Sequence, residues 1–310
     1  MLSKKLEYER GLHPAQMDSF LDPNGVLFPL RDVLKSNDFQ IEFRKDYFNI
    51  YYKGGNLLKV KGSRRFGFEF DINYCNNKPE TQYKSQIESI LKQQDLYAAI
   101  MHLDYLTSEM ESWWAAGHDK KERREQHSIC QVNRQNENDV YVVDIEYAAT
   151  GYGRADILAV KHNGQSGKYK VYLIEYKQGN KSVSSGLKIV DGVVLPTSST
   201  GSFISGIYKH YEDASRLAGL LRNDLLNTVR NSIYTRNRLG LAAFPSAETL
   251  DSIKFDDEIE MRFVLSDYKK LDAERDVLER ELSAVRIKEK ESRLKWDCIL
   301  ISADDYRLRV

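Results

Sequence analysis

The chain is poor in cysteine and has no long apolar run. Its three cysteines, Cys75, Cys130 and Cys298, lie far apart in the sequence. None stands in a CxxC pair or beside a histidine at zinc-binding spacing, and an odd, scattered set makes no disulfide framework. No run of about 18 apolar residues occurs, and the start MLSKKLEYER lacks the apolar region of a signal peptide. We therefore expect no membrane partner and a cytoplasmic location.

The sequence also lacks an excess of either charge. Lysine plus arginine number 46 and aspartate plus glutamate number 46, so the formal net charge is zero. Any contact with nucleic acid would have to come from a local basic patch. The GYG sequence at 151–153 lacks the third glycine and the helix of a dinucleotide-binding fingerprint, which excludes that class. With 310 residues, 41% of them hydrophobic, the chain is long enough for about two domains with a sizeable core.

The first part of the chain indicates a β-meander followed by helices. Four runs rich in aromatic and branched residues lie between 39 and 74, so we expect residues 1–80 to form an antiparallel β domain. Gly54-Gly55 suits a two-residue hairpin turn, because glycine tolerates the positive φ that such a turn needs. Residues 81–118 are expected to form a helical connector, with a break near Gln94-Asp95 and a stop at Gly117.

Residues 119–310 are predicted to form an α/β domain. The expected elements are a helix over 120–135, strands over 140–148, 154–161 and 169–177, a polar loop to about residue 202, a helix with an apolar stripe from Ile204 to Leu225, a strand over 258–267, a charged helix over 271–292 and a strand over 296–303. The order is therefore α-β-β-β-α-β-α-β.

Three charges interrupt two of these apolar strands. Asp156 lies in RADILAV, and Glu175 and Lys177 lie in YLIEYKQG. Residues two apart share a face of a strand, and antiparallel neighbours in register can bring Asp156 beside the other two. Burying such charges costs several kcal/mol per ion unless they are paired or bind metal. Two carboxylates on rigid strands suit Mg²⁺, with Mn²⁺ as an alternative, and a lysine beside the metal could act on a water or on a phosphate.

Asp156, followed by Glu175-Tyr176-Lys177 within an αβββαβ order of elements, resembles the PD-(D/E)XK nuclease superfamily. The resemblance covers about residues 119–303, and Ala155 stands where the family often has a proline. It implies a restriction-endonuclease-like core with a mixed central sheet, and a magnesium-dependent nuclease acting on nucleic acid, with DNA as the favoured substrate. It also implies that Asp156, Glu175 and the carbonyl of Tyr176 are metal ligands and that Lys177 acts on the attacking water.

Such nucleases often add a carboxylate from the helix before the sheet. Glu125 shares a face with the apolar Ile129, so it is the first choice for a further catalytic residue. Glu122 is a second choice. Glu146 is a third, because a three-residue turn at 150–152 would place it directly across from Asp156. The strand register, which would decide this, does not follow from the sequence.

A basic stretch in the N-terminal domain is the candidate nucleic-acid interface. Tyr51 and Tyr52 adjoin it, and basic residues interleaved with aromatics suit phosphate contact and base stacking. Its five cations are Lys53, Lys59, Lys61, Arg64 and Arg65. A solvated hairpin explains the stretch equally well, and the same ambiguity holds for Arg222, Arg230, Arg236 and Arg238.

Other residues are assigned to packing or to the surface. His210 and Asp213 lie one helical turn apart and favour a solvent-facing polar pair over a role in the site. Trp113-Trp114 favours packing between the two halves of the chain.

Two further functions remain beside the nuclease. One is a nuclease-like fold that binds nucleic acid or protein without cutting, and the other is a phosphate-binding or assembly module in which the three charges are structural. A protein partner or a homo-oligomer could use the N-terminal domain. The intact Asp, Glu and Lys set favours the enzyme.

Overall fold

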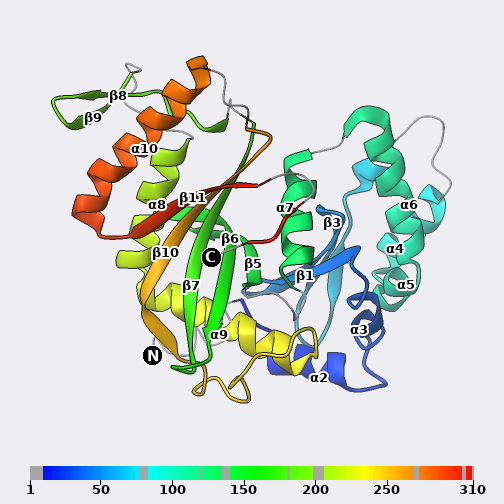
Figure 1. The fold of residues 1–310 in the computed structure, drawn as a ribbon. Helices are drawn as coiled ribbons and strands as arrows, with labels where there is room; N and C mark the ends of the chain where they lie inside the picture. Colours follow the sequence, from blue (N-terminus) through cyan, green and yellow to red (C-terminus); the bar gives the residue numbers. More distant parts are fainter. Residues whose placement is uncertain are drawn as a thin grey trace. The chain divides into compact units, whose positions relative to one another are not determined.

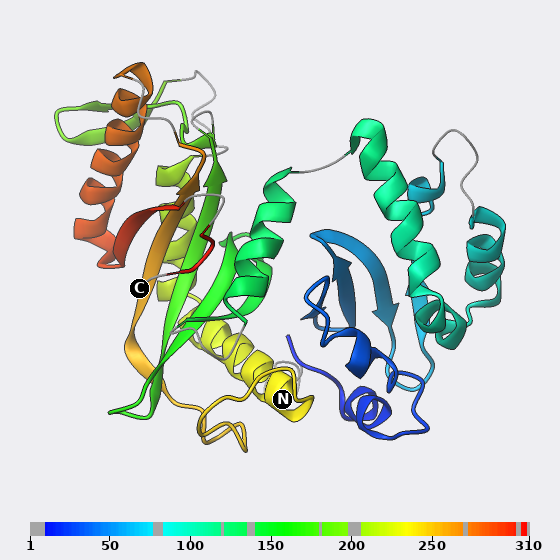
Figure 2. The ribbon, with the colours of Figure 1, turned by 45° about the vertical axis from the view of Figure 1, so that its right-hand side comes forward.

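The computed structural model describes residues 10–76, 83–118, 121–134, 140–179, 182–197, 206–268, 272–301 and 305–308. The chain forms two compact units, and each is described by itself (Figures 1 and 2). Unit 1 contains residues 1–131 and 230–250, and unit 2 contains residues 132–229 and 251–310. These boundaries differ from the expected ones at 80 and 118, because a segment distant in sequence returns to unit 1.

Unit 1 combines a small sheet with several short helices. Its elements are α2 (Pro14–Leu21), α3 (Leu30–Val33), β1 (Phe39–Phe43), β2 (Tyr47–Tyr52), β3 (Gly55–Lys61), β4 (Gly67–Glu69), the 3-10 helix η1 (Ile72–Cys75), α4 (Lys84–Gln93), α5 (Leu96–Met101), α6 (Leu103–Trp113), the π-helix η2 (Trp114–His118) and α7 (Lys121–Val132). The division between the units falls inside α9 (Arg222–Arg238), whose last residues belong to unit 1.

The sheet of unit 1 is the antiparallel meander that the sequence predicts, in the order β1-β2-β3-β4. Its β2–β3 turn consists of Lys53 and Gly54, with φ of 44° and 88°. The turn therefore lies one residue before the expected Gly54-Gly55, because Gly55 already pairs with Tyr52. Two positive φ values fit a mirror-image turn, which matches the twist of a hairpin.

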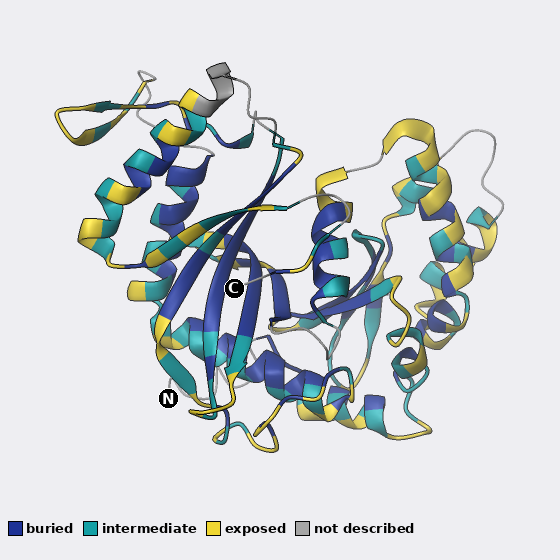
Figure 3. Ribbon diagram, in the orientation of Figure 1, coloured by how far each residue is buried: buried dark blue, intermediate teal, exposed yellow. Residues whose placement is uncertain are grey.

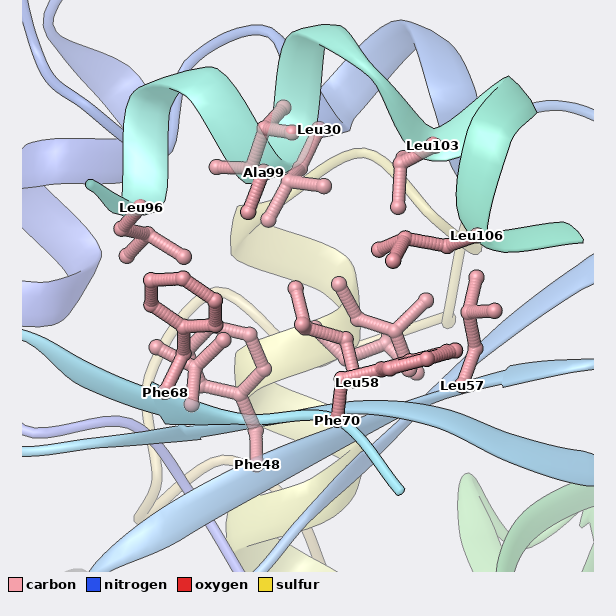
Figure 4. Close-up of a cluster of buried hydrophobic side chains, with 14 of the residues drawn as sticks. Leu30, Phe48, Leu57, Leu58, Phe68, Phe70, Leu96, Ala99, Leu103 and Leu106 are labelled. Carbon is pink, nitrogen blue, oxygen red and sulfur yellow. The ribbon is translucent and has the colours of Figure 1, made fainter. Parts of the chain in front are cut away.

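The apolar core of unit 1 lies between this sheet and its helices. Figure 4 shows Leu96 and Leu103 above Phe48 and Leu58, all of them buried. The helical segment breaks as the sequence predicts, since Gln94 ends α4 at φ 53° and the Asp95 side chain caps α5. Leucine side chains on one helical face and alternate residues of the strands thus supply the two halves of the core.

Unit 2 is built on a mixed five-stranded sheet, as expected for its α/β class. Its elements are β5 (Tyr141–Ala149), β6 (Gly153–Asn163), β7 (Lys168–Gln178), β8 (Leu187–Val190), β9 (Val193–Pro196), α8 (Ile207–Gly219), the first part of α9, β10 (Phe255–Ser266), α10 (Asp272–Ser292) and β11 (Lys295–Ile301). The strand order is β11-β10-β7-β6-β5. Strands β5, β6 and β7 are antiparallel, whereas β10 and β11 run parallel to β7.

Two expectations for unit 2 are wrong. The predicted polar loop contains the hairpin β8–β9, whose Leu187 packs with Tyr208 of α8 and Ala284 of α10. The predicted stripe to Leu225 is divided between α8 and α9, because α8 ends at Gly219. Ile204, at the start of that stripe, lies outside the described residues. Single-sequence periodicity detects an apolar face but not a change of helix direction along it.

Helices α8 and α10 form successive layers over the sheet of unit 2. Helix α8 contacts β6, β7 and β10, and α10 contacts α8 (Figure 1). The central strands β6, β7 and β10 are mostly buried, as their dark blue colour in Figure 3 shows. The start of α8 is held by Glu281 of α10, whose carboxylate accepts hydrogen bonds from the backbone N–H groups of Tyr208 and Ser185. A carboxylate at this position satisfies donors that a helix start leaves open.

Gly153 allows α8 to approach the start of β6. Its φ is 144°, and a Cβ there would lie 2.5 Å from Cβ and 2.9 Å from Cα of Asp213. Gly153→Ala is expected to strain the backbone and to push α8 away from the sheet. Gly151→Ala is the matched control, because Gly151 also has a positive φ but nothing within 4 Å.

We expect Gly151→Ala to lower the free energy of unfolding by about 1–2 kcal/mol. Gly153→Ala should cost about 1–3 kcal/mol more, because it adds overpacking to the same backbone strain. Chemical denaturation measures both variants. Equal losses of stability would show that α8 does not depend on this close approach.

Candidate functional site

The two strand carboxylates lie side by side in unit 2. Ile157 of β6 pairs with Ile174 of β7, so Asp156 and Glu175 are the next residues on the two antiparallel strands and face each other. The backbone N–H of Tyr176 donates to Oδ2 of Asp156 over 3.1 Å. The side chain of Tyr176 leaves from the other face, where its hydroxyl contacts that of Ser266. The alternation predicted for these strands is therefore present.

Lys177 completes the group on the same face. Its Nζ lies 2.5 Å from Oε1 of Glu175 and 3.9 Å from Oδ2 of Asp156. All three side chains are buried, with exposed fractions of 8% for Asp156, 1% for Glu175 and 7% for Lys177. The ammonium group thus offsets part of the cost of burying two like charges together.

His210 joins the group from α8. Its Nε2 lies 3.0 Å from Oε1 of Glu175. Burial first, and then the positive charge of Lys177, lower the pKa of His210 to about 2, so the imidazole is neutral. The contact is therefore a hydrogen bond from a neutral Nε2–H and not an ion pair. The expected solvent-facing pair is wrong, because His210 and Asp213 are both buried and Asp213 pairs with Lys209 and Arg216.

Glu175 has the most strongly perturbed environment of the group. Burial, followed by the negative charge of Asp156, raises the pKa of Glu175 well above its usual value, while Lys177 opposes the rise. Its second oxygen, Oε2, is buried and has no hydrogen-bond partner among the described residues. Nδ1 of His210 is likewise buried and has no hydrogen-bond partner among the described residues. Buried polar atoms are nearly always satisfied, so an open carboxylate oxygen beside a second carboxylate fits a cation.

Asp156 and Glu175 do not supply a full set of ligands for a metal ion by themselves. Within the described ranges, no three or more His, Cys, Asp or Glu side chains are grouped to hold a metal ion. Asp156 and Glu175 therefore supply two side-chain ligands at most by themselves. That number suits Mg²⁺, which keeps several waters and is commonly bound through one or two carboxylates.

The three candidates for a further carboxylate have different positions. Glu125 is buried on α7 with its Oε1 3.7 Å from Nζ of Lys121, and Glu122 is exposed on the same helix. Both belong to unit 1, so their role in the site stays a prediction. Pairing of Ala149 with Gly153 confirms the three-residue turn at 150–152, and the backbone of Glu146 consequently lies opposite Asp156. Glu146 is exposed and has φ 52°.

The basic stretch of unit 1 is partly neutralised by carboxylates that come from outside it. Lys53 pairs with Glu111 over 2.7 Å, and both Lys59 and Lys61 pair with Glu69 of β4. The remaining cations, Arg64 and Arg65, are exposed. Tyr51 and Tyr52 are only 5% and 7% exposed, so they present little surface for base stacking. Nucleic-acid binding by these five cations stays a prediction, with the two arginines as its strongest members.

The second basic stretch contains a core residue. Arg236 is 2% exposed and donates to the carbonyl of Ile41 and to the carboxylate of Glu42, which is itself fully buried. Its guanidinium also lies 5.3 Å from the ring centroid of Phe43. The sequence shows no sign of this pairing, because its members are almost two hundred positions apart.

Comparisons with known proteins add no family to this description. No family model matches the chain, and neither a curated protein nor a solved structure does. No helix in the described ranges combines the length and the apolar character needed to cross a membrane.

Proposed function

We propose that this protein is a metal-dependent nuclease that hydrolyses phosphodiester bonds in nucleic acid, with DNA as the favoured substrate. The observation that carries the proposal is the joint position of Asp156, Glu175 and Lys177 on one face of two adjacent strands, with one Glu175 oxygen buried and open. This set combines ligands for a hard cation with a positive group for a water or a phosphate.

The topology supports the same proposal. Strands β5, β6 and β7, helix α8 and strand β10 of unit 2 follow one another in the order expected of a restriction-endonuclease-like core, with the β8–β9 hairpin and α9 as additions, and helix α7 of unit 1 precedes them in the sequence. Strand β10 lies parallel to β7, next to the strand that carries Glu175 and Lys177. Strand β7 is the central strand of the sheet and both side chains are buried on it, which restricts their positions as the placement of reacting groups requires.

Each residue has a separate part in the proposed reaction. Asp156, Glu175 and the carbonyl of Tyr176 would hold Mg²⁺ or Mn²⁺, which would polarise a phosphoryl oxygen and lower the pKa of a bound water. Lys177 would orient the attacking water and offset negative charge on the phosphate. His210, which is neutral, would hold Glu175 in place through its Nε2–H.

Metal affinity should depend on pH in a range set by Glu175. A metal ion needs the ionised carboxylate, and the raised pKa of Glu175 means that protons compete well above the usual glutamate value of about 4.3. Affinity for Mn²⁺ should therefore be highest near pH 8 and should fall by up to about tenfold per pH unit below the Glu175 pKa. Calorimetric titrations between pH 8 and about pH 5 measure this, and a flat profile would rule out ligation by Glu175.

One cleavage assay tests the proposed function. Labelled single-stranded and double-stranded DNA and RNA are incubated with the protein and Mg²⁺, Mn²⁺ or EDTA. The proposal expects shortened products with either metal and none with EDTA. Intact substrates under every metal condition, from a protein that is shown to be folded, would overturn it.

A second function has one specific observation in its favour. Oε1 of Glu175 already accepts from both Lys177 and His210, and a buried network of this kind can be purely structural. The chain would then be a nuclease-like module that binds nucleic acid or protein without cutting. Metal-independent binding of nucleic acid with no cleavage would favour this alternative.

A further inference from the structure

Unit 1 contains a cavity that none of the candidate metal-site residues lines. Its volume is about 480 Å³, within the size range of small-molecule sites. The residues that line it come from the β2–β3 turn, η1, the end of α6 with η2, and the start of α7. Trp113 and Trp114 had been expected to pack the two halves of the chain together, and both line this cavity while remaining partly exposed.

The cavity has aromatic walls held in place by neighbouring rings. Trp113 stacks on His118 with centroids 3.8 Å apart, and Tyr74 meets Trp113 nearly edge-on. Trp114 stacks on Tyr52 with ring planes 7° apart. Gly117, with φ 97°, breaks the helix between the two rings, a backbone conformation that glycine adopts without strain. Rings fixed in this way lose little conformational entropy when a flat ligand binds.

Three cationic residues belong to the lining of the cavity. Arg123 and Arg124 line it from α7, and Lys53 lines it from the β2–β3 turn. Lys53 pairs with Glu111 over 2.7 Å, and the two arginines add two further positive charges to the lining. Asp71 is the acidic residue of the lining, and its Oδ1 already accepts hydrogen bonds from the backbone and side chain of Asn73. The lining therefore favours a ligand that is both aromatic and negatively charged.

We propose that this cavity binds a nucleoside 5′-phosphate, with its base against the tryptophan side and its phosphate toward Arg123 and Arg124. The aromatic side supplies stacking for a base of any kind, and guanidinium groups match the geometry of phosphate oxygens. The same chemistry is present in a free nucleotide and at the 5′ end of a single strand. The inference goes beyond hydrolysis at Asp156 and Glu175 and does not require a metal ion.

Binding is measured in EDTA, so that the outcome is independent of cleavage. Trp296→Phe removes the third tryptophan of the chain and leaves Trp113 and Trp114 as the fluorescent reporters. In this background, adenosine 5′-monophosphate should quench fluorescence saturably with Kd below about 1 mM. Adenosine and inorganic phosphate should each bind far more weakly. A 5′-phosphorylated oligoadenylate that competes with the nucleotide at lower concentration would identify the strand end as the source of the ligand.

Variants assign the binding to this cavity. Trp113→Ala should weaken nucleotide binding about 5- to 150-fold, and Trp113→Phe should weaken it less, because a smaller ring still stacks. Arg123→Gln with Arg124→Gln should weaken it about 10- to 100-fold. Lys92→Gln removes an exposed cation on α4 of the same unit, away from the cavity lining, and serves as the matched control, with unchanged affinity. Because a Trp113 variant loses a fluorescent reporter, calorimetry measures nucleotide binding by these variants. Circular dichroism verifies that each variant is folded.

Three results would overturn the proposal. These are the lack of saturable nucleotide binding below about 1 mM, equal binding of phosphate or adenosine, and full binding by the folded Arg123 and Arg124 double variant. None of them bears on metal-dependent cleavage, so failure here would leave the proposed nuclease function standing. Failure of the cleavage assay would likewise leave the nucleotide site intact.

Discussion

Lys177→Ala is expected to lower the rate of phosphodiester cleavage by about 10²- to 10⁴-fold, the usual contribution of one positioned acid–base group. The ammonium lies 2.5 Å from Glu175 and 3.9 Å from Asp156, so it is within reach of a water held by either carboxylate. Metal binding should survive, because lysine is not a ligand. The measurements are single-turnover cleavage with Mg²⁺ and a parallel Mn²⁺ titration of the same protein.

Lys188→Ala is the matched control for this prediction. Lys188 lies on β8 of the same unit and is exposed, so its removal should leave cleavage unchanged. Asp156→Asn should differ from Lys177→Ala in its metal binding. The amide has the same shape and can still accept from the N–H of Tyr176, but it is a poor metal ligand. This variant should lose both metal binding and cleavage. Cleavage by Lys177→Ala at the rate of the unmodified protein would refute the role given to this lysine.

Arg236→Met is expected to destabilise unit 1 by about 3–5 kcal/mol, the usual cost of removing one partner of a buried ion pair. The fully buried Glu42 would lose the guanidinium of Arg236, while the side chain of Gln40 would still donate a hydrogen bond to it. Methionine retains much of the volume, so the loss reports the charge more than a cavity. Denaturant unfolding, followed by circular dichroism, measures the change.

Two further variants separate the loss of the buried charge pair from other effects of Arg236→Met. Arg238→Ala, at an exposed position on the same helix, should change stability by less than about 0.5 kcal/mol. The double variant Arg236→Met/Glu42→Leu removes both charges and should recover most of the loss, because a buried ion pair and an apolar pair are often nearly equal in free energy. A loss in the double variant as large as in the single variant would attribute the effect to packing instead.

Local patterns in the sequence predicted the elements that the site depends on. Alternation in the strands placed Asp156, Glu175 and Lys177 on one face, and in the structure Lys177 lies within ion-pair distance of both carboxylates. The period of two in a strand is enough for that prediction, since it needs only neighbouring strands in register. The meander of unit 1 followed in the same way from runs of aromatic and branched residues.

The features that the sequence did not reveal depend on contacts between distant segments. His210 reaches Glu175 because Glu281 and Gly153 fix where α8 begins and how closely it approaches the sheet. Arg236 pairs with Glu42 across an even longer separation in the sequence. Neither contact leaves a periodic signal in one sequence, because helical spacing reports which face is apolar and not which partner a polar residue meets.

The basic stretch of unit 1 illustrates the same limit on local reasoning. Five cations without an intervening acid suggested a phosphate-binding surface. Three of them pair with Glu69 and Glu111, which follow the stretch or belong to another element. The partners that neutralise a run of charges are therefore near it in space and not along the chain. The cavity of unit 1 likewise takes its aromatic and cationic lining from separate segments of the sequence.

The most direct test of the central claim is a calorimetric Mn²⁺ titration at pH 8 of the unmodified protein, Asp156→Asn and Glu175→Gln. If the two carboxylates share a metal ion, the unmodified protein binds Mn²⁺ at one site, and each substitution alone removes that binding while circular dichroism stays unchanged. Mn²⁺ binding of equal affinity in all three proteins, or none in the unmodified protein, would contradict a metal site at Asp156 and Glu175.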